Sequence, residues 1–126
     1  MKIEHLAIWV HDLEKMKSFY RKYFNAEAGP KYFNAEKNFE SYFLHLKEGC
    51  RIELMRVPRV NEFTKKEMLG LAHIAISVGS KELVDSLTQK LKSEGFNVIG
   101  EPRTTGDGYY ESVILDPEGN RVEITI

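Results

Sequence analysis

Residues 3–10 read Ile-Glu-His-Leu-Ala-Ile-Trp-Val, and residues 71–78 read Leu-Ala-His-Ile-Ala-Ile-Ser-Val. Both stretches contain the pattern His-x-Ala-Ile-x-Val. A second match follows in each half, because residues 48–54 read Glu-Gly-Cys-Arg-Ile-Glu-Leu and residues 118–124 read Glu-Gly-Asn-Arg-Val-Glu-Ile. The two matches occur in the same order and at nearly the same spacing, so the sequence predicts two copies of one structural unit.

The first copy is expected to form a strand, a helix and three further strands. Asp12 is a candidate N-cap for the helix, since a short polar side chain there precedes apolar residues at helical spacing. Those apolar residues are Leu13, Met16, Phe19 and Tyr23. The strands of this copy are expected at 3–10, 30–36, 40–47 and 50–57.

The second copy repeats this order. Its helix is expected to begin after Ser80 and to end at Gly95, with an apolar stripe at Leu83, Leu87 and Leu91. The residues Asp116-Pro117-Glu118-Gly119-Asn120 are a strong turn signal between its last two strands. The strands of this copy are expected at 71–79, 96–101, 109–115 and 120–126.

These elements predict an α+β fold made of two βαβββ repeats, one over about 1–57 and one over about 71–126. The linker is 58–70, with a helical turn around 62–68. Four strands cannot enclose a core alone, so the units are expected to pair within one domain, 1–126. The helices would then cover the outside of a curved mixed sheet, and the inner faces would form a cleft.

Strand alternation selects the side chains that face this cleft. In the first strand, Leu6, Ile8 and Val10 are expected under the helix, which turns His5 and Trp9 to the other face. The same alternation turns one histidine and one glutamate of each copy away from the helices. These four residues are His5, Glu53, His73 and Glu123.

A single histidine or glutamate on a strand is usually a packing or surface residue, but here both types recur at matched positions. Two imidazoles and two carboxylates make a mixed nitrogen and oxygen donor set. Such a set, with room for two waters, suits Ni, Co, Mn, Fe or Zn. The sequence therefore predicts a divalent metal in the cleft.

At these residues the sequence resembles the vicinal oxygen chelate superfamily (the glyoxalase, bleomycin resistance and dioxygenase proteins), and glyoxalase I, or lactoylglutathione lyase, within it. The resemblance covers essentially the whole chain. The motifs that carry it are His5-Leu-Ala-Ile-Trp-Val-His-Asp-Leu-Glu, Phe19-Tyr20, Arg51-Ile-Glu-Leu, His73-Ile-Ala-Ile-Ser-Val and Asp116-Pro-Glu-Gly-Asn-Arg-Val-Glu-Ile.

The resemblance implies one divalent metal per site, Ni, Co or Zn, bound by His5, Glu53, His73 and Glu123. It implies a lyase or isomerase that converts the hemithioacetal of a 2-oxoaldehyde and a thiol through an enediolate. Glu123 is the better candidate for the catalytic base, with Glu53 opposite it. A homodimer is also implied, since glyoxalase I builds each site from two chains. Four ligands can equally meet within one chain, so the sequence leaves both arrangements open.

The sequence departs from glyoxalase I where that enzyme grips glutathione. An arginine is common near the position of Trp9, and an asparagine near that of Val57, and neither is present here. Trp9 and Met55 indicate a more apolar pocket, and Arg56 or Arg59 could replace the missing polar contacts. Trp9, Met55 and Arg56 are therefore the expected substrate-binding residues.

Two alternatives remain open on the same fold. One is a small-molecule binding or antibiotic resistance protein, and the other is an epimerase that also moves a proton beside a carbonyl. The complete set of four candidate ligands favours an enzyme over a pure binding protein.

Composition excludes several other classes. The net charge is −1 over 126 residues, without the basic excess typical of nucleic-acid binding. No apolar stretch approaches the length needed to cross a bilayer, and the N-terminus does not resemble a signal peptide. Cys50 is the only cysteine, so no disulfide can form within the chain. We therefore expect a cytoplasmic protein with a small-molecule substrate.

Overall fold

The computed structural model describes residues 3–61, 70–106 and 108–126. The chain divides into two compact units, Met1–Thr64 and Lys65–Ile126. The boundary falls inside the expected linker, and the helical turn expected at 62–68 lies outside the described residues.

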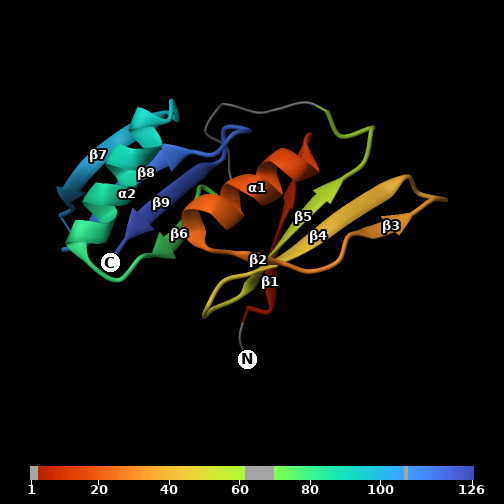
Figure 1. Ribbon diagram of the computed structural model, residues 1–126, viewed down its shortest axis with the longest axis horizontal. Coiled ribbons are helices and arrows are strands. Elements are labelled where there is room, and N and C mark those ends of the chain that lie inside the picture. The colour runs from red at the N-terminus through yellow and green to blue at the C-terminus, as the bar shows by residue number, and fades with distance from the viewer. Residues whose placement is uncertain (1–2, 62–69, 107) are drawn as a thin grey trace. The chain divides into compact units, whose positions relative to one another are not determined.

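Unit 1 has the predicted order of elements, with one strand more than expected (Figure 1). Its parallel pair, β1 with β5, lies at one side of a sheet with the order β1-β5-β4-β2, and the short β3 also pairs with β4. The strand expected near 30–36 is shorter, and a two-residue strand precedes it. The elements are β1 (His5–Trp9), α1 (Leu13–Phe24), β2 (Glu27–Ala28), β3 (Tyr32–Asn34), β4 (Phe39–His45) and β5 (Arg51–Arg56).

Unit 2 has the same topology. Its sheet has the order β6-β9-β8-β7, and again the first and last strands of the unit pair in parallel. The elements are β6 (Ile74–Ser77), α2 (Lys81–Ser93), β7 (Val98–Thr104), β8 (Tyr110–Leu115) and β9 (Arg121–Thr125). The predicted α+β class and the βαβββ repeat are therefore confirmed.

Both helices begin at the predicted caps. The Asp12 carboxylate accepts a hydrogen bond from the Lys15 backbone N–H at 2.9 Å, and the Ser80 hydroxyl accepts one from the Leu83 N–H at 3.3 Å. These bonds satisfy N–H groups that have no partner within the first helical turn. Gly95, with φ of 88°, follows the end of α2 as predicted.

The core of unit 1 lies between α1 and the sheet, which is where strand alternation places it. Val10 is 3% exposed, while Leu6 and Ile8 are half-buried. The helix buries both its aromatic and its aliphatic side chains against the buried residues of β4 and β5. The buried side chains are Leu13, Met16, Phe19, Tyr20, Tyr23 and Phe24 from α1, and Leu44, Ile52 and Leu54 from the sheet.

The predicted stripe of α2 is wrong at Leu83, which is 51% exposed. The buried positions are Val84, Thr88 and Leu91, while Leu87 is half-buried. The sequence pattern missed this because Thr88 was not counted as a core residue. Its hydroxyl bonds with the Val84 carbonyl and the Ser112 hydroxyl, both at 2.6 Å, so this polar group is buried with its bonds satisfied.

The predicted turn between β8 and β9 is also confirmed. The Asp116 carboxylate accepts hydrogen bonds from the Glu118 N–H at 3.0 Å and from the Asn120 N–H at 2.9 Å. Gly119 supplies the positive φ, 85°, that such a turn favours. The turn fixes the register of the two strands, in which Val113 lies opposite Glu123.

Two leucines of α2 provide a test of this packing. Leu91 is fully buried, so Leu91→Ala should lower the free energy of unfolding by about 2–5 kcal/mol. Leu83→Ala removes the same atoms from an exposed position and should cost about 0.5 kcal/mol or less. Urea unfolding of both variants measures the difference. Equal losses would contradict the orientation of the helix.

Candidate metal and substrate site

The parallel pairing of β1 with β5 brings His5 and Glu53 together. Ala7 lies opposite Glu53 in the register, and His5 precedes Ala7 by one step on the same face. Because alanine is small, the imidazole can lean toward the carboxylate. The His5 Nε2 atom lies 3.8 Å from a carboxylate oxygen of Glu53.

Unit 2 reproduces this arrangement. Ala75 lies opposite Glu123 in the β6–β9 pair, and His73 immediately precedes β6. The His73 Nε2 atom lies 3.5 Å from a carboxylate oxygen of Glu123. Each unit therefore contains one half-site, defined here as the pair His5–Glu53 in unit 1 and the pair His73–Glu123 in unit 2.

The donor separation in each half-site is close to that of two ligands of one ion. Both separations exceed the usual N–H···O hydrogen bond, which is about 2.7–3.2 Å. Two donors that bind one ion at about 2.0–2.2 Å lie about 3–3.5 Å apart. The 3.5 Å separation in unit 2 falls at the end of this range, and the 3.8 Å separation in unit 1 is slightly longer. Glu53 and Glu123 are 14% and 16% exposed, so their carboxylates are largely withdrawn from water, where an uncompensated charge is costly.

Within the described parts of the chain, no three His, Cys, Asp or Glu side chains gather into a group that could hold a metal. Each half-site alone supplies one nitrogen and one oxygen donor. The expected set of four ligands remains a prediction, as does the cleft that would contain it.

Sequence analysis missed a carboxylate beside His5. The Glu4 carboxylate lies 2.5 Å from His5 Nδ1, and its other oxygen pairs with the Arg51 guanidinium. The hydrogen bond from His5 is the main reason that the pKa of Glu4 is lowered, and Arg51 adds to the effect while partial desolvation opposes it. The signal in the sequence is an asymmetry between the copies, because Ala72 precedes His73.

The Arg51 guanidinium links Glu4 to an aromatic ring that also contacts His5. It lies over the Phe43 ring at 4.1 Å, and the edge-to-face contact between Phe43 and His5 has a centroid separation of 5.4 Å. Phe43 and Glu53 are opposite each other in the β4–β5 register. His5 is therefore held from one side by Glu4 and from another by Phe43.

The same face of unit 1 becomes apolar farther along the strands. Trp9 lies opposite Met55, and the Trp9 ring contacts Phe39 edge-to-face at 6.3 Å. Tyr32 contacts the same Phe39 ring at 6.0 Å. These four residues, Trp9, Tyr32, Phe39 and Met55, are called the apolar wall below.

Among the described residues of unit 2, the positions that correspond to Trp9, Met55 and Tyr32 hold polar or charged side chains. Ser77 lies opposite Thr125 where unit 1 has Trp9 opposite Met55, and Arg103 lies opposite Glu111 where unit 1 has Tyr32 opposite Ser41. The structure thus places Trp9 and Met55 on the same face as His5 and Glu53.

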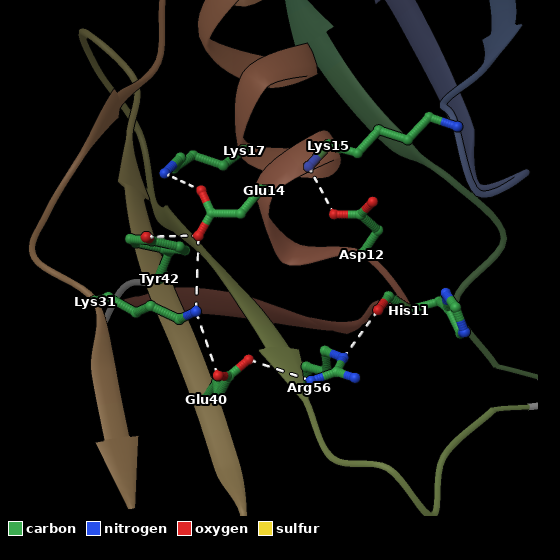
Figure 2. A network of polar contacts seen from close by, with 9 residues as sticks. All are labelled: His11, Asp12, Glu14, Lys15, Lys17, Lys31, Glu40, Tyr42 and Arg56. Atoms are coloured by element: carbon green, nitrogen blue, oxygen red, sulfur yellow. Dashed lines mark hydrogen bonds and ion pairs between the residues drawn. The ribbon is translucent and has the colours of Figure 1, made fainter.

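Arg56, the third expected substrate-binding residue, is not brought to that face. Strand alternation places it opposite Glu40 on the side of the sheet that α1 covers. Its guanidinium donates to the His11 carbonyl at 3.0 Å and pairs with Glu40 at 3.4 Å (Figure 2). The sequence reasoning missed this because it did not apply alternation to Arg56.

Figure 2 shows that Arg56 belongs to a chain of charges between α1 and the sheet. Lys31 lies 3.3 Å from Glu40 and 3.7 Å from Glu14. Glu14 also pairs with Lys17 and accepts a hydrogen bond from the Tyr42 hydroxyl at 2.9 Å. The bond from Lys17 is the main cause of the lowered pKa of Glu14, and it raises the pKa of Lys17 in turn.

Comparisons with known proteins agree with this topology. Residues 2–124 match the Glyoxalase/Bleomycin resistance protein/Dioxygenase superfamily. The uncharacterized protein YqjT of Bacillus subtilis is 30% identical over 97% of this chain and 96% of its own. The fosfomycin resistance protein FosX of Listeria monocytogenes is 33% identical over 84% of this chain and 75% of its own.

Among solved structures, glyoxalase I of Zea mays superposes with a TM-score of 0.81 at 22% identity. The match covers 98% of this chain but spans only 44% of the maize chain, so it bears on the fold alone. Of the helices in the described residues, none is long and apolar enough to cross a membrane.

The charge network predicts a pH-dependent effect at Glu14. Its pKa in the folded state lies below 4.5, so its stabilising effect is fully present above that pH and is lost as pH falls through the lowered value. Because this side chain is 56% exposed, Glu14→Gln should cost only about 0.5–1 kcal/mol near neutral pH.

Thermal unfolding of the parent and Glu14→Gln across acid and neutral pH measures this effect. The difference in stability should vanish once Glu14 is protonated in the parent, and added salt should reduce it. Glu36→Gln, in an exposed turn, is the control and should match the parent throughout. A stability difference that is independent of pH would contradict the prediction.

Proposed function

Because this chain belongs to the Glyoxalase/Bleomycin resistance protein/Dioxygenase superfamily, we propose that it is a metal-dependent lyase or isomerase of the glyoxalase I type. Its substrate is the hemithioacetal of a 2-oxoaldehyde and a thiol. The observation that carries the proposal is the repeated half-site, in which a histidine Nε2 faces a largely buried glutamate at 3.8 Å and at 3.5 Å.

His5, Glu53, His73 and Glu123 together hold one divalent ion in this proposal. Two imidazoles and two carboxylates suit Ni, Co or Zn, which accept nitrogen and oxygen donors. When bound, the ion supplies a positive charge that stabilises negative charge on the two adjacent substrate oxygens. The donor chemistry and the spacing within each half-site support this assignment.

In this proposal, side chains of the protein transfer the proton between two carbons of the substrate. Glu123 takes it from the carbon next to the carbonyl and returns it to the neighbouring carbon, so that an enediolate lies between the two steps. Glu53 occupies the matching position in the other repeat. Both carboxylates are mostly buried, on the face of their sheet that carries the histidine.

The apolar wall supports a substrate with an apolar portion. Trp9 and Met55 lie on the face of His5 and Glu53, where they offer ring and thioether surface. Arg56 is left out of this proposal, since it pairs with Glu40 on the other side of the sheet.

A second candidate function is antibiotic resistance by binding or modification. The similarity to the fosfomycin resistance protein FosX favours it. An epimerase would use the same proton-transfer residues, with a substrate that carries its own activated carbonyl. Turnover of a hemithioacetal separates the first proposal from both alternatives.

We predict that the protein binds one Ni, Co or Zn ion for each set of four ligands. Removing one donor from either half-site, as in His73→Ala or Glu53→Ala, should weaken binding at least tenfold, because each donor contributes directly to coordination. Calorimetry with the chelator-treated protein gives the affinity. His45→Ala, at an exposed histidine of β4, is the matched control.

Binding with parental affinity in both ligand variants would contradict the ligand set. Light scattering of the metal-bound protein then measures its oligomeric state. We propose a homodimer, which has twice the chain mass of 14.6 kDa, and a monomer of that mass with full metal occupancy would show that one chain completes the site alone.

We predict that metal-loaded protein isomerises hemithioacetals of methylglyoxal and phenylglyoxal. Glu123→Gln should lower kcat at least a hundredfold with metal retained, because an amide can bind a metal but cannot accept the proton. The assay uses several thiols and follows product formation. No turnover with any thiol, while fosfomycin raises the melting temperature, would favour the resistance function instead.

The same assay tests whether the apolar wall contacts the substrate. Trp9→Ala should reduce kcat/KM for the phenylglyoxal adduct about tenfold more than for the methylglyoxal adduct, since only the former carries a ring to bury. Phe33→Ala removes an exposed aromatic ring from the opposite face of β3 and should affect both substrates equally. Equal losses with Trp9→Ala would place the apolar portion elsewhere.

A further inference from the structure

The two half-sites have the same ligand types but differ in the residues next to their histidines. Glu4 precedes His5, whereas Ala72 precedes His73. Phe43 lies opposite Glu53, whereas Val113 lies opposite Glu123. An alanine and a valine offer neither a carboxylate nor a ring at the corresponding places in unit 2.

The contact between Glu4 and His5 decides which nitrogen of His5 is available. An ionised carboxylate only accepts hydrogen bonds, so the proton of a neutral His5 lies on Nδ1, 2.5 Å from Glu4. Nε2 then carries the lone pair, and it is Nε2 that faces Glu53. The remaining oxygen of Glu4 is engaged by Arg51, which limits rotation of the carboxylate.

Arg51 is itself fixed, because its guanidinium stacks on Phe43 while Phe43 meets the His5 ring edge-on. Glu4, His5, Phe43 and Arg51 thus form a closed ring of contacts. Glu4 is 57% exposed and Arg51 is 34% exposed, and such pairs add little to folding stability. The effect of this ring falls on the orientation of the imidazole.

We propose that Glu4 is a positioning residue that fixes His5 as an Nε2 metal ligand, which makes the half-site of unit 1 the more rigidly prepared of the two. The consequence for metal affinity rests on the function proposed above. The consequence for the tautomer of His5 does not, because it follows from the contact between Glu4 and Nδ1. Hydrogen-bond partners behind metal-bound histidines typically change metal affinity about 10–100-fold.

Long-range ¹H–¹⁵N NMR of the metal-free protein, at a pH where the imidazoles are neutral, tests the positioning directly. In the parent, His5 should show mainly the tautomer protonated on Nδ1, while His73 should carry a large share of the tautomer protonated on Nε2, the nitrogen that faces Glu123. In Glu4→Ala, which copies the alanine of the second repeat, His5 should gain the tautomer protonated on Nε2 as well. An unchanged His5 spectrum in Glu4→Ala would overturn the proposal.

Metal titration is the second readout. Glu4→Ala should weaken Ni or Zn binding at least tenfold and leave the melting temperature of the metal-free protein unchanged. Glu48→Ala, at an exposed turn position of the same unit, should match the parent in both measurements. Parental affinity in Glu4→Ala would overturn the proposal. A parent that binds no metal would instead refute the proposed function, and the tautomer of His5 would still decide the role of Glu4.

Discussion

Parallel pairing between the first and last strand of each unit is the constraint on which the half-sites depend. It sets Ala7 opposite Glu53 and Ala75 opposite Glu123. The small alanine side chain leaves the space into which the preceding histidine leans. A shift of one residue in either pairing would turn the glutamate toward the helix and bury an unpaired charge in the core. In unit 2 the turn held by Asp116 fixes β9 against its other neighbour, β8.

The repeat made the fold and the two His–Glu half-sites predictable from sequence. Strand alternation correctly placed His5 with Glu53 and Trp9 with Met55 on one face, and the caps at Asp12 and Ser80 are confirmed. These features depend on local spacing, which the sequence carries directly. The error at Leu83 has a different origin, because a buried threonine that bonds Ser112 replaced an expected apolar residue.

The features that the sequence did not reveal depend on contacts between distant residues. Alternation along β5 indicates the face of Arg56, but no spacing within β5 indicates that its partner is Glu40 on the neighbouring β4. Glu4 was missed for a related reason, since its role depends on Arg51, which reaches it from another strand. Comparing the two repeats position by position would have pointed to Glu4, because only one copy has a carboxylate before the histidine.

Differences between the copies also bear on which glutamate moves the proton. Duplication alone makes Glu53 and Glu123 equally good candidates for the base, since their exposed fractions and their distances to histidine are similar. Under the two proposals above, Glu4 and Phe43 hold the imidazole of unit 1 from behind, whereas unit 2 has Ala72 and Val113. A base that is also a metal ligand must leave the ion to accept a proton. With fewer groups behind its imidazole, His73 can adjust to such a movement, which under these proposals favours Glu123 as the base and Glu53 as the ligand that stays in place.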